Sequence, residues 1–176
     1  MKKLNAITLG LFITASTAAF ADNTGAVVHI NGSVTEPTCA FTVPNQNVDL
    51  DPISVNELKT TSIGTATAVK EKQFQMQLSC EENVDQNKIK LVVSGTTSAA
   101  GDNAIFANSS ADNGVGFEII HGDTPLKAEN ELDLAQLVSL NNGNNTLDLT
   151  ARYARTDDEI KGGSVDADVT FTVVYR

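Results

Sequence analysis

The sequence predicts an all-β fold in which short antiparallel strands pack as a sandwich, and the clearest sign is at the end of the chain. From Gly163 to Tyr175 small or apolar residues occupy the odd positions, and polar residues occupy the even positions from Ser164 to Thr172. Because successive side chains of a strand point to opposite faces, this period of two predicts one apolar and one polar face. The same period recurs earlier in the chain between clusters of turn-forming residues. Many short strands divided by turns are typical of an antiparallel sandwich.

The first residues predict a secretion signal. Met1-Lys2-Lys3 is positive, residues 4–20 carry no charge, and Ala19-Phe20-Ala21 supplies the small residues that a signal peptidase accepts. A membrane anchor is the alternative, but polar residues interrupt the apolar run that an anchor requires. Cleavage after Ala21 would leave Asp22–Arg176 as the mature chain, long enough for one domain with its own core.

The mature chain is acidic and contains a single pair of cysteines. It holds 10 basic and 22 acidic residues, because two of the 12 basic residues, Lys2 and Lys3, lie in the signal. This charge opposes nucleic-acid binding, which depends on Lys and Arg neutralising phosphates. In an oxidising compartment, Cys39 and Cys80 are expected to form a disulfide. No cofactor is predicted, and His29 and His121 lack the spacing to cysteine that a metal site requires.

The remaining elements are predicted in chain order. A strand pattern begins the mature chain between Asp22 and Cys39, where it fits either an ordinary first strand or a loose arm. Val55–Lys59 and Leu132–Leu140 fit a helical turn as well as a strand. Four further segments alternate as strands, and five turn signals lie among them. The strands are 74–80, 89–93, 115–119 and 147–153, and the turns are 31–32, 101–103, 113–114, 122–123 and 141–145.

The sequence gives little support to an enzyme. Neither His29 nor His121 lies in a recognisable triad motif, and no glycine-rich phosphate loop is present. The carboxylates of 157–159 lack the ligand spacing and the turn glycine of a calcium loop. A secreted carbohydrate-binding sandwich is a second possibility, but the chain has no Trp, and Tyr153 and Tyr175 fall in inward registers.

Several short motifs in order along the mature chain resemble those of chaperone-usher fimbrial subunits, close to the type 1 major pilins. They are Val-His-Ile-Asn-Gly at 28–32, the cysteine pair, Asn-Asn-Gly-Asn-Asn-Thr at 141–146, Ala-Arg-Tyr at 151–153, and Gly163 with the penultimate Tyr175. The resemblance implies an incomplete immunoglobulin-like antiparallel sandwich that lacks its final strand and is completed by donor-strand complementation. It therefore implies a structural subunit of a cell-surface fimbria, non-enzymatic, exported through the periplasm and supporting cell adhesion.

The resemblance also assigns partners and site residues. A periplasmic chaperone, an outer-membrane usher and neighbouring subunits would be the partners, and basic residues of the chaperone would hold the carboxylate of Arg176. Residues 22–31 would form the donor arm and residues 32–176 the pilin domain. The inserted residues of the arm would be Thr24, Ala26, Val28 and Ile30. The groove that receives a strand would be lined by Gly163, Val165, Ala167, Val169, Phe171, Val173, Tyr175 and Arg176.

The arm departs from the family pattern at one position. Donor strands of the family usually carry glycine two residues before the valine that corresponds to Val28, whereas this chain has Ala26 there and Gly25 one place out of register. Either the register differs or the groove of the neighbouring subunit accommodates a methyl group. The resemblance is shared by major, minor, adaptor and terminator subunits, and it does not distinguish among them.

Overall fold

The computed structural model describes residues 31–33 and 38–176. The chain divides into two units, Met1–Val34 and Thr35–Arg176, and every strand and helix named below lies in the second. Among the described residues, no helix is long and apolar enough to span a membrane. The proposed signal and the proposed donor residues Thr24, Ala26, Val28 and Ile30 lie outside the described residues.

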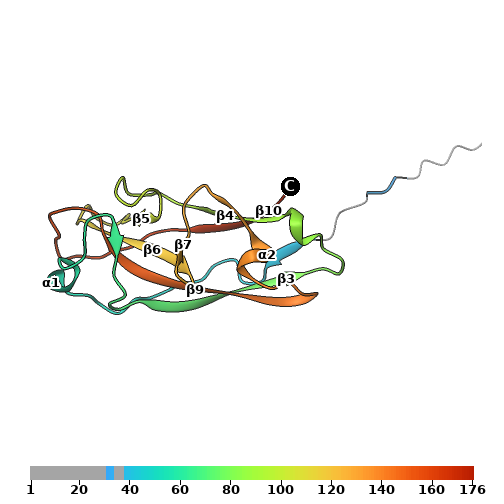
Figure 1. The fold of residues 1–176 in the computed structure, drawn as a ribbon, viewed down its shortest axis with the longest axis horizontal. Helices are drawn as coiled ribbons and strands as arrows, with labels where there is room; N and C mark the ends of the chain where they lie inside the picture. Colours follow the sequence, from blue (N-terminus) through green and yellow to red (C-terminus); the bar gives the residue numbers. More distant parts are fainter. Residues whose placement is uncertain (1–30, 34–37) are drawn as a thin grey trace, which may run out of the picture. The chain divides into compact units, whose positions relative to one another are not determined.

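Ten strands and three short helical turns make up this unit (Figure 1). The strands are β1 Cys39–Phe41, β2 Thr65–Ala66, β3 Lys72–Cys80, β4 Ile89–Ser94, β5 Ile105–Ala107, β6 Val115–His121, β7 Thr124–Pro125, β8 Glu131–Asp133, β9 Gly143–Arg155 and β10 Thr170–Tyr175. The helical turns are α1 Val55–Leu58, α2 Leu134–Leu137 and the 3-10 turn Gln86–Lys88. The fold is therefore dominated by strands, as the sequence predicts.

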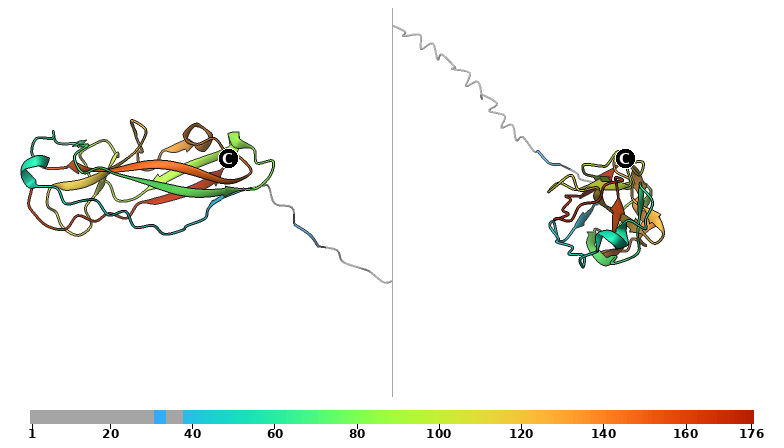
Figure 2. Two further views of the ribbon diagram at one scale, coloured as in Figure 1. Left: turned by 90° about the horizontal axis from the view of Figure 1, so that it is seen from below. Right: turned by 90° about the vertical axis from the view of Figure 1, so that its left-hand side faces the viewer.

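The strands form two antiparallel sheets. The larger sheet has the order β1-β3-β9-β6-β5, with β2 also paired to β9 and β7 to β6, and the smaller sheet has the order β10-β4-β8. Figures 1 and 2 show β4 and β10 side by side, with the long strands β3 and β9 in the other layer. The two sheets therefore form the layers of a sandwich, and β1 and β10 each lie at an edge.

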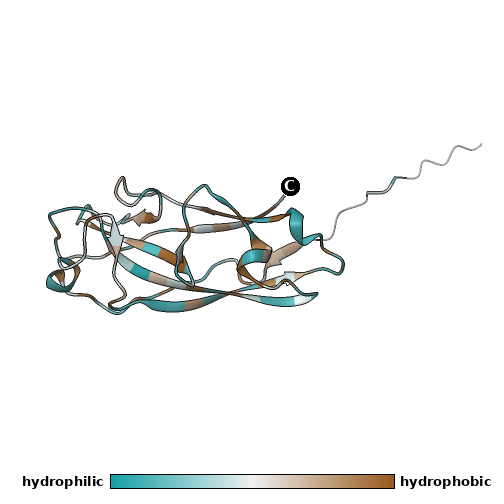
Figure 3. Cartoon of the chain, in the orientation of Figure 1, coloured by the Kyte–Doolittle hydropathy of each residue, from teal (hydrophilic) through white to brown (hydrophobic). Residues whose placement is uncertain are grey.

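The main hydrophobic core lies between these sheets. Leu78, Leu147 and Leu149 of the larger sheet pack in one cluster with Leu91 and Val93 of the smaller sheet. Polar residues alternate with these side chains, and Figure 3 shows the resulting changes of hydropathy along the strands. A second cluster gathers Leu58, Val115, Tyr153 and Ile160. Burial of one face of each strand is the main source of stability for such a sandwich.

The four internal strands predicted from alternation are confirmed as β3, β4, β6 and β9. The structure also shows which conformation the two ambiguous segments, Val55–Lys59 and Leu132–Leu140, adopt. Residues 55–58 form α1, where Ser54 Oγ accepts from the Glu57 N–H at 3.1 Å and Glu57 Oε2 accepts from the Ser54 N–H at 3.0 Å. This reciprocal cap explains why a helical turn forms there. The segment beginning at Leu132 divides into the end of β8 and the helix α2.

The predicted turn at 141–145 is wrong in its second half, because β9 already begins at Gly143. Asn145 is buried, and its side chain bonds to the backbone of Asn141, at the start of the turn. Its Oδ1 accepts from the Asn141 N–H at 2.6 Å, and its Nδ2 donates to the Asn141 carbonyl at 2.9 Å. The amide thus closes the turn from within the strand.

The terminal strand is also shorter than predicted. It is regular only from Thr170, although the alternation begins at Gly163. The reason is that β4 ends at Ser94, opposite Thr170, so the preceding residues have no ladder partner in the smaller sheet. Beyond Ser94 the chain pairs with the larger sheet instead, where the Ser98 N–H donates to the Ile105 carbonyl at 2.9 Å.

The predicted disulfide between Cys39 and Cys80 is present. The two cysteines are opposite partners in the β1–β3 ladder, and both are buried. The bond therefore fixes the edge strand β1 to the long strand β3. Closing a loop of this length contributes on the order of 4 kcal/mol through the unfolded state.

Candidate functional site

The outer edge of β10 is open among the described residues. In antiparallel pairing, the backbone groups of successive residues point alternately to the two sides of a strand. The Arg176 N–H donates to the Lys88 carbonyl at 2.9 Å, which places the even-numbered residues of this strand toward β4. The N–H and C=O groups of Phe171, Val173 and Tyr175 therefore point away from β4, where the described part of the chain supplies no strand.

The side chains of the terminal segment alternate in burial. Those at even positions from Ser164 to Thr172 are exposed. Those at odd positions are half-buried, and none of them is fully covered. Val165 packs on the second cluster, and the other odd residues, Ala167, Val169, Phe171, Val173 and Tyr175, pack on the main core. The segment thus presents an apolar face that touches the core but is incompletely covered.

Gly163 and Arg176, the first and last of the proposed groove residues, are more exposed than the apolar residues between them. Gly163 is exposed, and a Cβ built on it would meet only Asn113 Nδ2, at 3.7 Å. Arg176 is also exposed, and its Nε donates to Glu131 Oε1 at 3.0 Å. The hydrogen bond from Arg176 lowers the pKa of the Glu131 carboxyl. In this structure, Gly163 and Arg176 flank the apolar face and do not form part of it.

Tyr175 joins the two edge strands at one end of this face. Its hydroxyl donates to the Cys39 carbonyl at 3.1 Å and accepts a hydrogen bond from the Cys39 N–H. Cys39 begins β1, the edge strand of the larger sheet, and carries the disulfide to Cys80. The penultimate residue therefore connects β10 to the disulfide-bonded end of the other sheet.

Gly95 lies against the backbone of the terminal segment just before β10 begins. A Cβ built on Gly95 would lie 2.8 Å from the Asp168 carbonyl oxygen and 3.0 Å from Phe106 Cδ1. Phe106 is fully buried in the main core. Neither neighbour is a flexible side-chain end, so only glycine fits at this position without displacing the segment.

We expect Gly95→Ala to destabilise the subunit by about 1–3 kcal/mol, because the added methyl group overpacks a closely packed site. Thermal unfolding of the purified protein measures the effect, and a fall in melting temperature of several degrees is the expected result. Gly162→Ala is the matched control, since a Cβ there would meet nothing within 4 Å. Equal melting temperatures for the two variants would contradict the close contact with Asp168.

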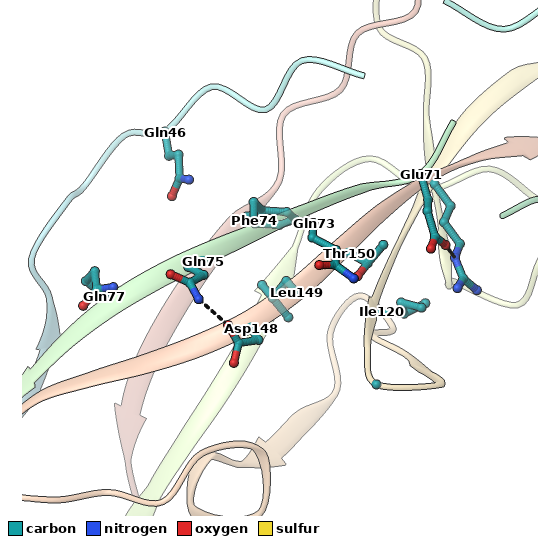
Figure 4. Close-up of a pocket in the computed structure, with 12 residues that line it drawn as sticks. Gln46, Glu71, Gln73, Phe74, Gln75, Gln77, Ile120, Asp148, Leu149 and Thr150 are labelled. Carbon is teal, nitrogen blue, oxygen red and sulfur yellow. Dashed lines mark hydrogen bonds and ion pairs between the residues drawn. The ribbon is translucent and has the colours of Figure 1, made fainter. Parts of the chain in front are cut away.

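A hollow of about 740 Å³ with a mixed polar and apolar lining lies on the larger sheet, over β3 and β9 (Figure 4). Four amides contribute to its lining, those of Gln46, Gln73, Gln75 and Gln77. Gln75 Nε2 donates to Asp148 Oδ1 at 2.7 Å across the two strands. No residue of the smaller sheet lines the hollow, so it is separate from the open edge of β10.

Glu71 and Arg152, which help to line this hollow, form a charge cluster with Glu118. Arg152 Nε donates to Glu71 Oε2 at 2.7 Å, and Glu118 is opposite Arg152 in the β6–β9 ladder. Burial raises the pKa of the Glu118 carboxyl, and the positive charge of Arg152 opposes part of that rise. Among the described residues, no group of three or more His, Cys, Asp or Glu side chains is placed to hold a metal ion.

We expect Glu118→Gln to stabilise the protein slightly at neutral pH but not in acid. A carboxyl whose pKa rises on folding holds its proton more tightly in the folded state. The stabilisation that the protonated Glu118 carboxyl gives to the folded state is complete below the ordinary pKa of glutamate, and it is lost as pH rises through the raised pKa. Glutamine cannot ionise and escapes that loss. Urea unfolding of both proteins at about pH 4 and about pH 8 measures the difference, which should appear only at the higher pH.

The sequence alone did not identify Gly95, the tie from Tyr175 to Cys39, or the loop at 108–113 that contacts the terminal segment. Asn108-Ser109-Ser110 is a turn-forming run, and the predicted turn at 113–114 overlaps the end of the loop, but neither signal indicates what the loop contacts. The loop bonds to Asp166, more than fifty residues later in the chain. Asn108 and Asp166, for example, are 58 residues apart. No local pattern reports such a pairing.

The sequence matches the family model described as Fimbrial protein over residues 28–176. The Fimbrial subunit type 1 of Salmonella typhimurium is 30% identical to this chain, and the alignment covers 99% of this chain and 98% of that protein. The Type-1 fimbrial protein, A chain, of Escherichia coli (strain K12) is 31% identical, with 100% and 99% covered. Both similarities extend over the whole chain.

Solved structures share the fold. The P pilus rod subunit PapA superposes with a TM-score of 0.64 at 16% identity, covering 78% of this chain and 99% of that one. A chain from the structure of a chaperone-usher pilus gives a TM-score of 0.61 at 16% identity, covering 90% and 100%. These structures and the two sheets described above confirm the predicted all-β sandwich.

Proposed function

This chain belongs to the fimbrial protein family, and from that premise we propose that its subunits join by exchanging strands at the open edge of β10. The chain is a structural subunit of a surface fimbria. In our proposal, residues 22–31 of the mature chain form the donor arm, which adds a strand to the edge of a second copy. Thr24, Ala26, Val28 and Ile30 are the residues that would face the acceptor's core.

One observation carries this proposal: the apolar face of the terminal segment is half-buried and borders an open strand edge. Phe171 and Val173 pack on the main core without being fully covered, and their backbone groups point away from β4. An exposed apolar strand edge is a site of aggregation unless another strand pairs with it. An added strand supplies both the missing backbone hydrogen bonds and apolar side chains, a mode that the fimbrial family exemplifies.

We propose that two strands occupy this edge in succession, and that an usher acts between the two steps. A periplasmic chaperone covers it first, an outer-membrane usher receives the complex, and the arm of the neighbouring subunit then replaces the chaperone's strand. The carboxylate of Arg176 would be held by basic residues of the chaperone. Since the guanidinium of Arg176 already bonds Glu131, the carboxylate is the charge at this terminus that would attract them.

We further propose that the subunit is not an enzyme. The imidazole of His121 lies near a backbone group, with Nδ1 at 2.9 Å from the Asp148 carbonyl oxygen. A histidine that acts as a general base requires a nucleophile or substrate within hydrogen-bond reach. The contact of His121 is instead one that a ring forms across neighbouring strands, and it supports a structural role.

Electron microscopy of fibres shed by the producing cell, combined with mass spectrometry, tests this function. We expect fibres in which this protein is present, with a mass that corresponds to a chain beginning at Asp22. Detection of the protein only as a soluble monomer, with no fibres containing it, would overturn the proposal. Its abundance relative to other components would also show whether it is the main subunit or a minor one.

A further inference from the structure

The part of the terminal segment that precedes β10 is held along one side by a loop. Asn108 Nδ2 donates to the Ser164 carbonyl at 3.0 Å, and Asn108 Oδ1 accepts from the Asp166 N–H at 2.9 Å. The Ser109 N–H donates to the Asp166 carbonyl at 2.7 Å, and the Ser109 hydroxyl donates to the same oxygen at 3.0 Å. These bonds reach the backbone of the segment where it has no ladder partner.

All of these contacts lie on the side of the segment that β4 occupies farther along. Ser164 and Asp166 are even-numbered, as are the residues of β10 whose backbone groups face β4. The carbonyl of Asp168, which lies between Asp166 and β10 in the chain, faces Gly95, the residue that follows β4. The side chains keep the same period, since Ser164, Asp166 and Asp168 are exposed. The loop therefore continues the line of β4 after that strand has ended.

The side chain of Asn108 is held in place before any partner arrives. Its Nδ2 also donates to Asn113 Oδ1 at 3.0 Å, and its Oδ1 accepts from the Ser110 N–H at 3.0 Å. Asn113 is itself buried, and its Nδ2 donates to the Ser164 carbonyl at 3.3 Å. A primary amide offers the same donor and acceptor pair as a peptide group. Asn108 can thus serve the segment as a strand residue would.

We propose that Asn108 and Ser109 act as a surrogate partner strand, which extends the acceptor edge from β10 back to Val165. The backbone groups of the even-numbered residues Ser164 and Asp166 are bonded to the loop. The N–H and C=O groups of the odd-numbered residues Val165, Ala167 and Val169 therefore point to the open side. An incoming strand from a second copy of this chain then pairs with the odd residues from Val165 to Tyr175, and not with those of β10 alone. This inference rests on the proposed function and adds Asn108 to it as a positioning residue.

Amide hydrogen exchange at single-residue resolution, on fibres assembled from the full mature chain, tests this inference. In the wild type, we expect slow exchange at the amides of Val165, Ala167, Val169, Phe171 and Val173. In Asn108→Ala, the first three should exchange about tenfold faster, while Phe171 and Val173 stay slow. Ser110→Ala is the matched control and should leave all five slow, because the Ser110 hydroxyl contacts the Asp166 carboxylate and no backbone atom of the segment.

The possible outcomes separate this inference from the proposed function. Fast exchange at Val165, Ala167 and Val169 in wild-type fibres, with Phe171 and Val173 slow, would overturn the surrogate strand and leave strand exchange intact. Fast exchange at all five would overturn strand exchange itself. Faster exchange in Asn108→Ala at Asp166 alone would show that Asn108 has only a local structural role, and would also overturn the inference.

A second variant keeps the inference testable if Asn108→Ala fails to assemble. Asn108→Asp retains an acceptor for the Asp166 N–H but cannot donate to the Ser164 carbonyl. We expect Asn108→Asp fibres to show faster exchange at Val165 and Ala167 than the wild type. If neither variant assembles, the same amides are measured in the complex of each variant with the periplasmic chaperone, whose strand covers the same edge. Unchanged exchange in both variants would overturn the inference.

Discussion

Replacing Phe171 by Asp is expected to abolish fibre formation and to lower the periplasmic level of the subunit severalfold. Phe171 is half-buried against the main core, and its backbone groups point to the open side of β10. A carboxylate at this position would face the core on one side and the incoming strand on the other. Desolvating it should cost several kcal/mol, because neither water nor a positive partner is available there. The penalty should weaken both the chaperone complex and the contact between subunits.

Thr172→Asp is the matched control for this prediction. Thr172 follows Phe171 directly, but its side chain is exposed on the opposite face of the strand, as is that of Asp168. The same charge should therefore have little effect. Immunoblots of periplasmic extracts and the yield of sheared fibres measure the two variants in matched strains. Equal behaviour would show that the register of the terminal strand is wrong, and a stable soluble monomer of Phe171→Asp without a chaperone would contradict the incomplete sandwich.

The long strands could be predicted from the sequence because their two faces have different environments. In β3, Leu78 and Cys80 are buried, whereas Ser79 between them and Gln75 earlier in the strand are exposed, so polarity alternates with the pleat. β9 follows the same rule over most of its length. Such a pattern reports which side of a strand meets the core. It does not report which strand lies beside it.

The errors arose where pairing, and not burial, decides the structure. Val165, Ala167 and Val169 keep the alternation of a strand because their side chains touch the core, yet β4 ends too early to pair with them. In the opposite case, Asn144 and Asn145 have turn-forming side chains but pair with β3 as part of β9. Here the tertiary partner outweighs the local preference.

In the candidate site too, the features that depend on burial could be predicted, and those that depend on tertiary contacts could not. Alternation predicts that Phe171 and Val173 share one apolar face, and the resemblance to fimbrial subunits assigns that face to the groove. The contacts that position them, from Asn108, Gly95 and Tyr175, join segments far apart in the sequence. Hydrogen bonds of one or two side chains leave no periodic signal, so a single sequence could not reveal them.

Removing residues 22–30 from the mature chain should leave a subunit that folds with its chaperone but adds no further subunit to a fibre. The domain described above, including the disulfide and the open edge of β10, lies wholly within Thr35–Arg176, so its fold should survive the deletion. The predicted donor residues would be gone, and no other segment is proposed to fill the edge of the next copy. We expect chaperone-bound subunit at wild-type levels and fibres below detection.

A pair of point variants tests the register of the arm without deleting it. Val28→Asp would place a charge on the face that the alternation assigns to the acceptor's core, where desolvation should cost several kcal/mol. Val27→Asp puts the same charge one residue away, on the face assigned to solvent, and should assemble nearly normally. Fibre yield and chaperone-bound subunit are measured together, so that a failure to fold is distinguished from a failure to donate. Normal fibre growth from the arm deletion would refute donation by this segment. Loss of fibres confined to Val27→Asp would show that the register is shifted by one residue, so that Gly25 and not Ala26 faces the acceptor's core.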